Sequence, residues 1–239
     1  MKMTLNHGSG HIDFEVIYSD RRTIAIIISP EGDVKVRVPY RTSTQVIMDL
    51  VDRKAEWIIR KLQQMELIKT RADKRDFLDD EPFPYLGRDH PLYIRIDARL
   101  SRAKAILEDG LFIIDTPAAD TILLKNAMEA WYRDAALKYI RSRIDDYAPI
   151  LNASPKRITI RQQKTRWGSC SSKGNLSFNW RIVMAPAKIM DYVIVHELCH
   201  LIRPDHSREF WSLVGSIIPD YKERRTWLKN NAAKLTWQP

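Results

Sequence analysis

The residues with the clearest chemistry in this sequence are two histidines with a glutamate between them, in His196-Glu197-Leu198-Cys199-His200. On a helix, residues four apart project from one face a single turn apart, so both imidazoles can reach one ion. Zinc is the expected ion because neutral imidazole suits it. Glu197 follows the first histidine, where its carboxylate can take a proton from a water that the metal acidifies. The pattern predicts a hydrolase with Zn²⁺ as cofactor and Glu197 as general base.

The residues around this pair are apolar on nearly every turn, among them Val193, Ile194 and Leu201. A helix of this composition is expected to be deeply buried. A buried carboxylate without a partner is costly, so the polar residues on this helix need something to bind. The alternative is a pair of core histidines held by ordinary hydrogen bonds. We favour the metal site because these residue types occur at the spacing that zinc hydrolases use.

A third ligand is expected shortly after the pair. His206 lies ten residues after His196, and Pro204-Asp205 would break the helix so that the chain can fold back toward the ion. Glu209 is the alternative, because a glutamate from a following helix completes some zinc sites. We favour His206, since a neutral imidazole that a short loop can deliver needs the least rearrangement.

A basic segment precedes the histidine pair. Residues 154–190 contain eight Lys or Arg and no Asp or Glu, with aromatic residues interleaved. Such a segment can bind phosphates or nucleic acid, or it can receive an extended peptide by edge pairing. It can equally be solvated charge on strands whose aromatic residues face the core. Our candidates for substrate binding within it are Arg161, Lys164, Arg166 and Trp167.

The elements before this segment are mostly strands. Residues 23–29 and 34–38 form a predicted hairpin around a Pro-Glu-Gly-Asp turn, and residues 105–107 and 111–114 form another around Glu-Asp-Gly. Between the hairpins, apolar residues near the helical period predict one long helix over 43–69. We place a domain boundary at Pro117. The prediction is a strand-rich N-terminal domain over 1–117, with one long helix, and a catalytic domain over 118–239.

The catalytic domain is expected to begin with a helix over 118–147 that stops before Pro149. Strands at 157–161 and 176–183 follow. The last third is predicted to be helical, with the histidine pair on a helix that opens at Pro186. Strands and helices in separate runs of this kind predict the α+β class.

Composition limits the environment of the protein. The chain has 239 residues, a formal net charge of +9 and two cysteines, Cys170 and Cys199. A single possible cysteine pair makes a disulfide framework impossible and suits a reducing compartment. No segment is apolar for long enough to cross a bilayer, so we expect a cytoplasmic protein without a membrane partner. The positive charge makes anionic partners plausible but says nothing about the fold.

Several further motifs resemble the YgjP-like metallopeptidase-domain family, which consists of predicted zinc hydrolases related to SprT-like zincins. The resemblance spans nearly the whole chain, from Tyr85-Leu-Gly87 in the first half to the segment 161–170, Asn179-Trp-Arg181, the segment 191–201, His206-Ser207, Phe210-Trp211 and Pro219-Asp-Tyr221.

The resemblance implies a zincin-like catalytic domain with zinc at His196, His200 and His206 and a catalytic Glu197. It also implies a peptide or protein substrate, since related zincins mostly cleave peptides. Two alternatives remain open. In one, the basic segment binds a nucleoside triphosphate or another phosphoanhydride, and the chain is a pyrophosphatase. In the other, residues 154–190 contact nucleic acid and the chain acts on DNA-bound proteins.

Overall fold

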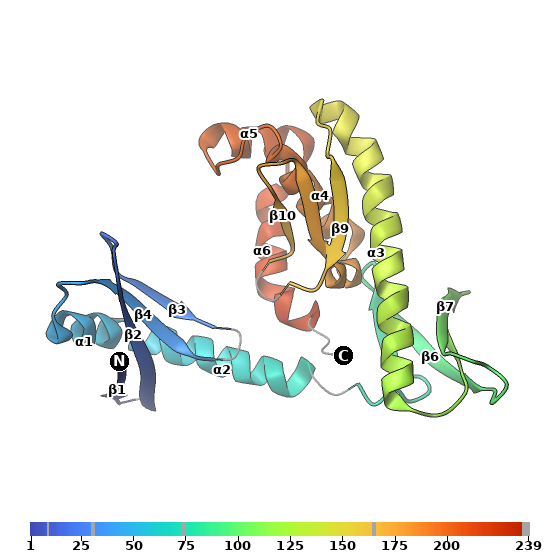
Figure 1. Ribbon diagram of the computed structural model, residues 1–239, viewed down its shortest axis with the longest axis horizontal. Helices are drawn as coiled ribbons and strands as arrows, with labels where there is room; N and C mark the ends of the chain where they lie inside the picture. The colour runs from blue at the N-terminus through green and yellow to red at the C-terminus, as the bar shows by residue number, and fades with distance from the viewer. Residues whose placement is uncertain (9, 30–31, 73–74, 164–165, 236–239) are drawn as a thin grey trace. The chain divides into compact units, whose positions relative to one another are not determined.

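The computed structural model describes residues 1–8, 10–29, 32–72, 75–163 and 166–235 (Figure 1). Its contacts divide the chain into two compact units, Met1–Arg71 and Ala72–Pro239. Both units combine strands with helices, as the expected α+β class requires. None of the helices in these described ranges is long and apolar enough to span a bilayer.

The first unit is a four-stranded sheet with helices on one face. The strands β1 (Lys2–His7), β2 (Gly10–Ser19), β3 (Ala25–Ile28) and β4 (Val34–Pro39) have the order β1-β2-β4-β3. The pair β3 and β4 is antiparallel, which confirms the first predicted hairpin. Alternate residues of β2 and β4, such as Phe14 and Val36, are buried against Ile47 and Val51 of the helices.

The helix predicted over 43–69 is two helices, α1 (Thr44–Arg53) and α2 (Ala55–Ala72). The chain leaves helical geometry at Lys54, whose φ is −105° and ψ 3°. The buried residues Ile47, Val51, Ala55 and Ile58 keep helical spacing across the break and share one core. The apolar pattern therefore continues through Lys54, and this is why it does not reveal the break.

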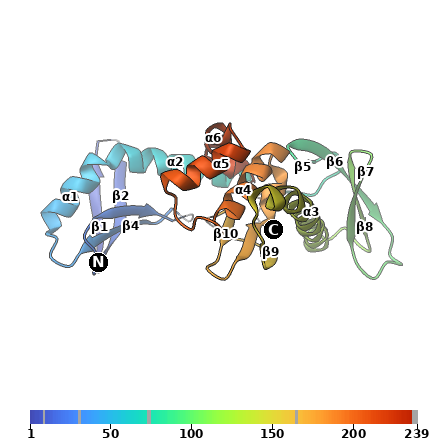
Figure 2. The ribbon, with the colours of Figure 1, turned by 90° about the horizontal axis from the view of Figure 1, so that it is seen from above.

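The second unit has a long helix between two sheets (Figures 1 and 2). The helix α3 (Thr121–Leu151) contacts strands of both sheets. The first sheet comprises β5 (Pro82–Tyr85), β6 (Arg88–Ile96), β7 (Lys104–Glu108) and β8 (Leu111–Thr116), in the order β5-β6-β8-β7. The second comprises β9 (Arg157–Arg161), β10 (Gly168–Cys170) and β11 (Asn175–Asn179), in the order β10-β11-β9.

The remaining elements of this unit are short helices. They are η1 (Trp180–Met184), α4 (Ala187–Cys199), α5 (Arg208–Ile217), α6 (Tyr221–Asn231) and η2 (Ala232–Leu235). The strand predicted over 176–183 is wrong in its second half, because Asn179 ends the strand and caps η1 by accepting from the Arg181 amide. The helix α3 also continues through Pro149, since a proline in the last turn forfeits only one internal hydrogen bond there.

The boundary between the units lies before β5, well ahead of the position expected at residue 117. The reason is packing, because β5–β8 share one core with α3 and α4. The Phe112 ring lies 4.6 Å from Trp131, and the Tyr132 hydroxyl donates to the Pro84 carbonyl at 2.7 Å. Residues 72–116 thus belong to the unit that carries the histidines.

The turn between β5 and β6 packs against the start of α4. The Leu86 amide donates to the Val183 carbonyl at 2.8 Å. Gly87 has a φ of +80°, and a Cβ built on it would lie 2.8 Å from the Pro186 Cα. Only glycine tolerates this conformation and this close approach. The Tyr85-Leu-Gly87 motif therefore supports the helix on which the histidine pair lies.

Candidate metal centre

His196 lies in the last turn of α4 and His200 is the C-cap residue that follows it, and the two lie on one face, as the four-residue spacing predicts. Their Nε2 atoms are 3.2 Å apart. Asp191, five residues before His196 on the same helix, accepts two hydrogen bonds from the Arg143 guanidinium of α3, at 2.9 and 3.0 Å. Tyr139 and Tyr147 of α3 also donate to this carboxylate, each at 3.3 Å. This cluster ties α4 to the long helix and holds the histidine face in place.

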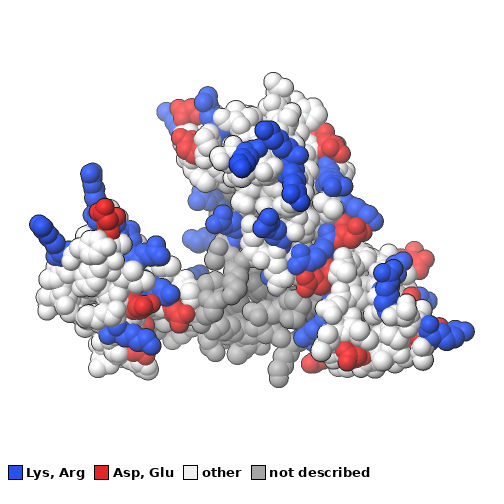
Figure 3. Space-filling model, in the orientation of Figure 1, with Lys and Arg blue, Asp and Glu red and all other residues white. Residues whose placement is uncertain are grey.

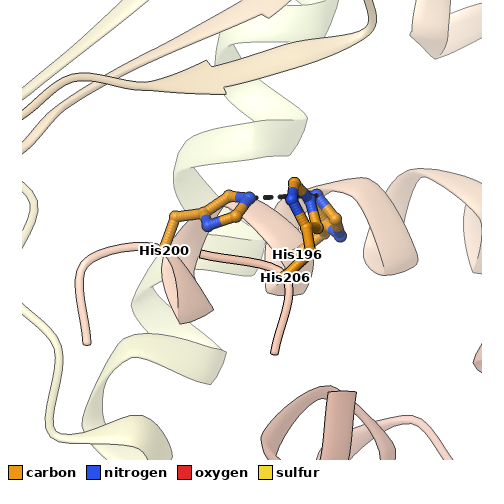
Figure 4. A group of neighbouring side chains, drawn as sticks. All are labelled: His196, His200 and His206. Atoms are coloured by element: carbon orange, nitrogen blue, oxygen red, sulfur yellow. Dashed lines mark hydrogen bonds between the residues drawn. The ribbon is translucent and has the colours of Figure 1, made fainter. Parts of the chain in front are cut away.

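His206 comes from the loop between α4 and α5, and its Nε2 lies 3.2 Å from the His196 Nε2. The three imidazoles turn toward one another (Figure 4). Their ligand atoms all lie within 4.8 Å of one another. Within the described part of the chain, these three histidines form the one cluster of potential ligands that could hold a metal ion. Glu209, the alternative third ligand, lines a different hollow with Arg203 and Arg208.

The spacing of the nitrogens fits a tetrahedral ion. Two ligands at about 2.0–2.1 Å from zinc in a tetrahedral site are roughly 3.3 Å apart, close to the 3.2 Å observed for both His196 pairs. The His196 Nε2 lies 3.2 Å from the Nε2 atoms of both His200 and His206. The one hydrogen it can carry forms a good hydrogen bond with only one of them, whereas one cation can bind all three nitrogens. The residues present therefore suit a divalent metal that prefers nitrogen ligands.

The protonation states of these imidazoles also suit a ligand role. The His200 Nδ1 lies 3.1 Å from the Arg203 carbonyl, and a carbonyl only accepts, so Nδ1 carries the hydrogen and Nε2 keeps a free lone pair. Burial lowers the pKa of His196 to about 3, and repulsion from Arg225 and from the protonated forms of His200 and His206 acts in the same direction. His196 is therefore neutral at physiological pH, as metal ligation requires.

Aromatic residues of α5 hold the imidazoles in place. Ser207 caps this helix by accepting from the Phe210 amide at 3.4 Å. The Phe210 ring stacks on His200 at 4.4 Å, and the Trp211 ring lies 5.6 Å from His196. The cap fixes where α5 begins, so it also fixes where these two rings meet the histidines.

Glu197 faces the same hollow as the histidines. This hollow measures about 670 Å³ and is lined by the three histidines, Glu197, Arg166 and residues of β10 with the turn after it. Glu197 is 5% exposed as a residue, and its side-chain Oε2 has no hydrogen-bond partner among the described residues. Burial raises its pKa to about 8, and the positive charge of Arg166 opposes the shift. A metal cation beside the carboxylate would act in the same direction as Arg166 and lower this raised pKa.

Gly168 allows Glu197 to occupy this position. A Cβ built on Gly168 would lie 2.5 Å from the Glu197 Oε1 and 2.6 Å from its Cγ. No side chain fits in that space, so the carboxylate rests directly on the backbone of β10. Sequence reasoning missed this glycine because its only signal, a position in a turn-rich connection, does not indicate which distant residue it contacts.

The four candidates for substrate binding lie in different surroundings. Arg166 lines the hollow. Trp167 is half-buried and packs against the core, and its carbonyl accepts from the Asn179 amide at 2.8 Å. Arg161 is exposed at the end of β9 and is not among the residues that line the hollow. Lys164 falls outside the described residues.

Of the comparisons with protein families, curated proteins and solved structures, the family match is the informative one. A sequence model of the YgjP-like, metallopeptidase domain family matches residues 22–231. No curated protein matches the chain. One solved structure, the metallopeptidase zymogen of Pyrococcus abyssi abylysin, is similar at 22% identity with a TM-score of 0.35, and the match covers 38% of this chain and 93% of that chain. Because the family match spans most of the sequence, the chain belongs to the YgjP-like metallopeptidase domain family.

Proposed function

We propose that this chain is a zinc-dependent metallopeptidase with a zincin-like catalytic domain, in which His196, His200 and His206 hold the ion and Glu197 is the general base. Membership of the family indicates metal-dependent peptidase activity in general. The observation that supports the finer proposal is the convergence of three imidazole nitrogens beside a buried carboxylate in one hollow. Zinc, when bound, polarises a carbonyl and acidifies water.

The protein residues supply the remaining parts of the reaction. Glu197 takes the proton of the attacking water, and it can return a proton to the leaving amine. Its Oε2 is the oxygen available for this, since no described residue hydrogen-bonds to it. Gly168 has no side chain, and this leaves the space that the other carboxylate oxygen, Oε1, occupies.

The strand β10 is suited to bind a peptide. Among the described strands it pairs only with β11, so no described strand occupies its other edge. Its residues Gly168, Ser169 and Cys170 line the hollow. An extended peptide that pairs with this edge would run past the histidines, with its backbone held by main-chain hydrogen bonds.

Basic side chains also gather over β9–β11 (Figure 3). They are the feature on which the triphosphate and nucleic-acid alternatives depended. The family match supports neither of those partners, and we propose peptides as the substrate class.

The test compares wild type with Glu197→Gln on casein-derived peptides and on nucleoside triphosphates, with metal content measured in each sample. General base catalysis contributes about 10²–10⁴-fold, so the variant should keep its metal and lose peptide turnover by a factor in that range. Glu209→Gln is the matched control, because the same chemical change falls outside the hollow and should leave turnover and metal content intact. Peptide turnover by Glu197→Gln at the wild-type rate would refute the assignment. Hydrolysis of triphosphates alone would replace the proposed substrate.

A further inference from the structure

A second hollow is lined in part by Trp211, whose ring lies 5.6 Å from the His196 ring. It measures about 590 Å³ and is lined by Trp211, Tyr221, Lys222, Arg225, Thr226 and Lys229. Five of these residues come from α6, at positions 221, 222, 225, 226 and 229, and their spacing of three or four residues places them on one helix face. The lining contains three cationic side chains and no acidic one.

The cations of this hollow have no acidic partner among the described residues. No salt bridge there involves Lys222, Arg225 or Lys229, whereas the neighbouring Arg224 is paired with Asp220 at 2.8 Å. All three side chains are exposed at the hollow. Three like charges side by side repel one another, and a bound anion would relieve that repulsion.

The Arg225 guanidinium is held in a defined position. Its Cζ lies 4.9 Å from the centre of the Trp211 ring, in the range of a cation–π contact. The Trp211 ring in turn stacks on Tyr221 at 5.3 Å with an interplanar angle of 14°. A guanidinium that rests on a ring uses its flat face there and keeps the N–H groups on its edge free for a bidentate acceptor such as a carboxylate.

This hollow is within reach of a substrate bound at the histidines. The Trp211 ring lies 5.6 Å from His196 and 5.7 Å from His206. Together with the Arg225 distance, this places the guanidinium within about 11 Å of the His196 ring, roughly three residues of an extended peptide.

We propose that the hollow formed by Trp211, Tyr221, Lys222, Arg225, Thr226 and Lys229 is a subsite that binds a carboxylate of the substrate, within three residues of the bond that is cleaved. This rests on the proposed peptidase function. The carboxylate can belong to an Asp or Glu side chain or to the C-terminus of the peptide, since both present the same two oxygens to Arg225. The subsite would make the enzyme selective for acidic peptides or for peptide ends.

The test measures peptide binding and peptide cleavage separately. Fluorescent peptides with blocked ends carry Glu or Gln at each of three positions on either side of the scissile bond, and a further neutral peptide carries a free or an amidated C-terminus. Binding is measured by fluorescence polarisation on the metal-loaded Glu197→Gln protein, and kcat/KM is measured on the wild type. A charge-assisted hydrogen bond should favour one Glu peptide over its Gln partner by about tenfold.

Variants of Arg225 assign the preference to this hollow. Arg225→Gln should reduce the Glu-to-Gln ratio to about one, and Arg225→Glu should invert it. Arg141→Gln is the matched control, because it removes one exposed positive charge from α3 and should preserve the ratio. If only the free C-terminus is preferred, the subsite binds the end of the chain, which still supports it.

The two proposals fail in different ways. Equal binding of every Glu and Gln pair together with equal binding of the free and amidated ends, or a preference that survives Arg225→Gln, would overturn the subsite even if the peptides are cleaved. A preference in binding that depends on Arg225, without cleavage by the wild type, would support the subsite and refute the peptidase function.

Discussion

Gly168→Ala should disable the proposed peptidase without removing its metal. The added methyl would lie 2.5 Å from the Glu197 Oε1 and 2.6 Å from its Cγ. Non-bonded carbons prefer about 3.5–4.0 Å, so the Glu197 side chain or β10 must move by about 1 Å. Gly168 has no positive φ, so the alanine adds this contact without backbone strain. The effect should therefore fall on the carboxylate.

A 1 Å misplacement of a catalytic group costs about 10²-fold in rate, and we expect a loss of that size in kcat on a peptide substrate. Metal content should stay at the wild-type level, because the methyl is directed at the carboxylate and not at an imidazole. Overpacking should also cost about 1–3 kcal/mol of stability, which a thermal melt would record. Gly8→Ala is the control for a glycine replacement, since a Cβ there meets nothing within 4 Å.

A double-mutant cycle distinguishes this mechanism from general damage to the site. If the methyl acts through Glu197, it should cost about 10²-fold in wild type but less than about threefold in the Glu197→Gln background, because interacting residues are not additive. Losses that add fully, or a Gly168→Ala protein with wild-type kcat, would refute the reasoning.

Four further outcomes follow from the structure around the site. Gly87→Ala should destabilise the protein by about 2 kcal/mol or more, from a left-handed φ and a clash with Pro186, and an unchanged urea midpoint would contradict this. Asp191→Asn should lower the free energy of unfolding by about 1–3 kcal/mol, less than a fully buried ion pair would, because the Arg143 side chain is 29% exposed and solvent screens it. A lower Tm is expected, and a wild-type Tm would contradict this. In the metal-free protein His196 should lower stability as the pH falls below about 6.5, since its pKa is depressed to about 3 in the folded state and the unfolded chain takes up the proton first. Glu197, whose pKa is raised to about 8, should offset this loss down to about pH 4.5, so the His196 contribution is read as the difference from a His196→Gln protein. Urea unfolding midpoints measured between pH 7 and pH 4 test this. If His196→Gln and the wild type show the same pH dependence of stability, the assignment to His196 is wrong. Chelation of the metal should lower the Tm of the wild type, because an ion that binds only the folded state stabilises it.

The sequence was informative wherever the chemistry lies within one helical turn. The spacing of His196 and His200 alone implied that both face one ion, because helix geometry depends on the backbone and not on the rest of the fold. The same local logic located β3 with β4 and β7 with β8, since short turns allow only a few pairings.

Tertiary packing determined which residues that are distant in the sequence come into contact. The meeting of Gly168 with Glu197, the contact of Trp211 with Arg225 and the assignment of β5–β8 to the second unit all depend on how helices and sheets pack, and no residue spacing encodes them. The position of His206 against the pair is of the same kind, because a loop can carry a side chain in many directions until the core fixes its ends. Local hydrogen bonds determine an element, whereas burial of apolar surface shared by the whole unit determines which elements meet.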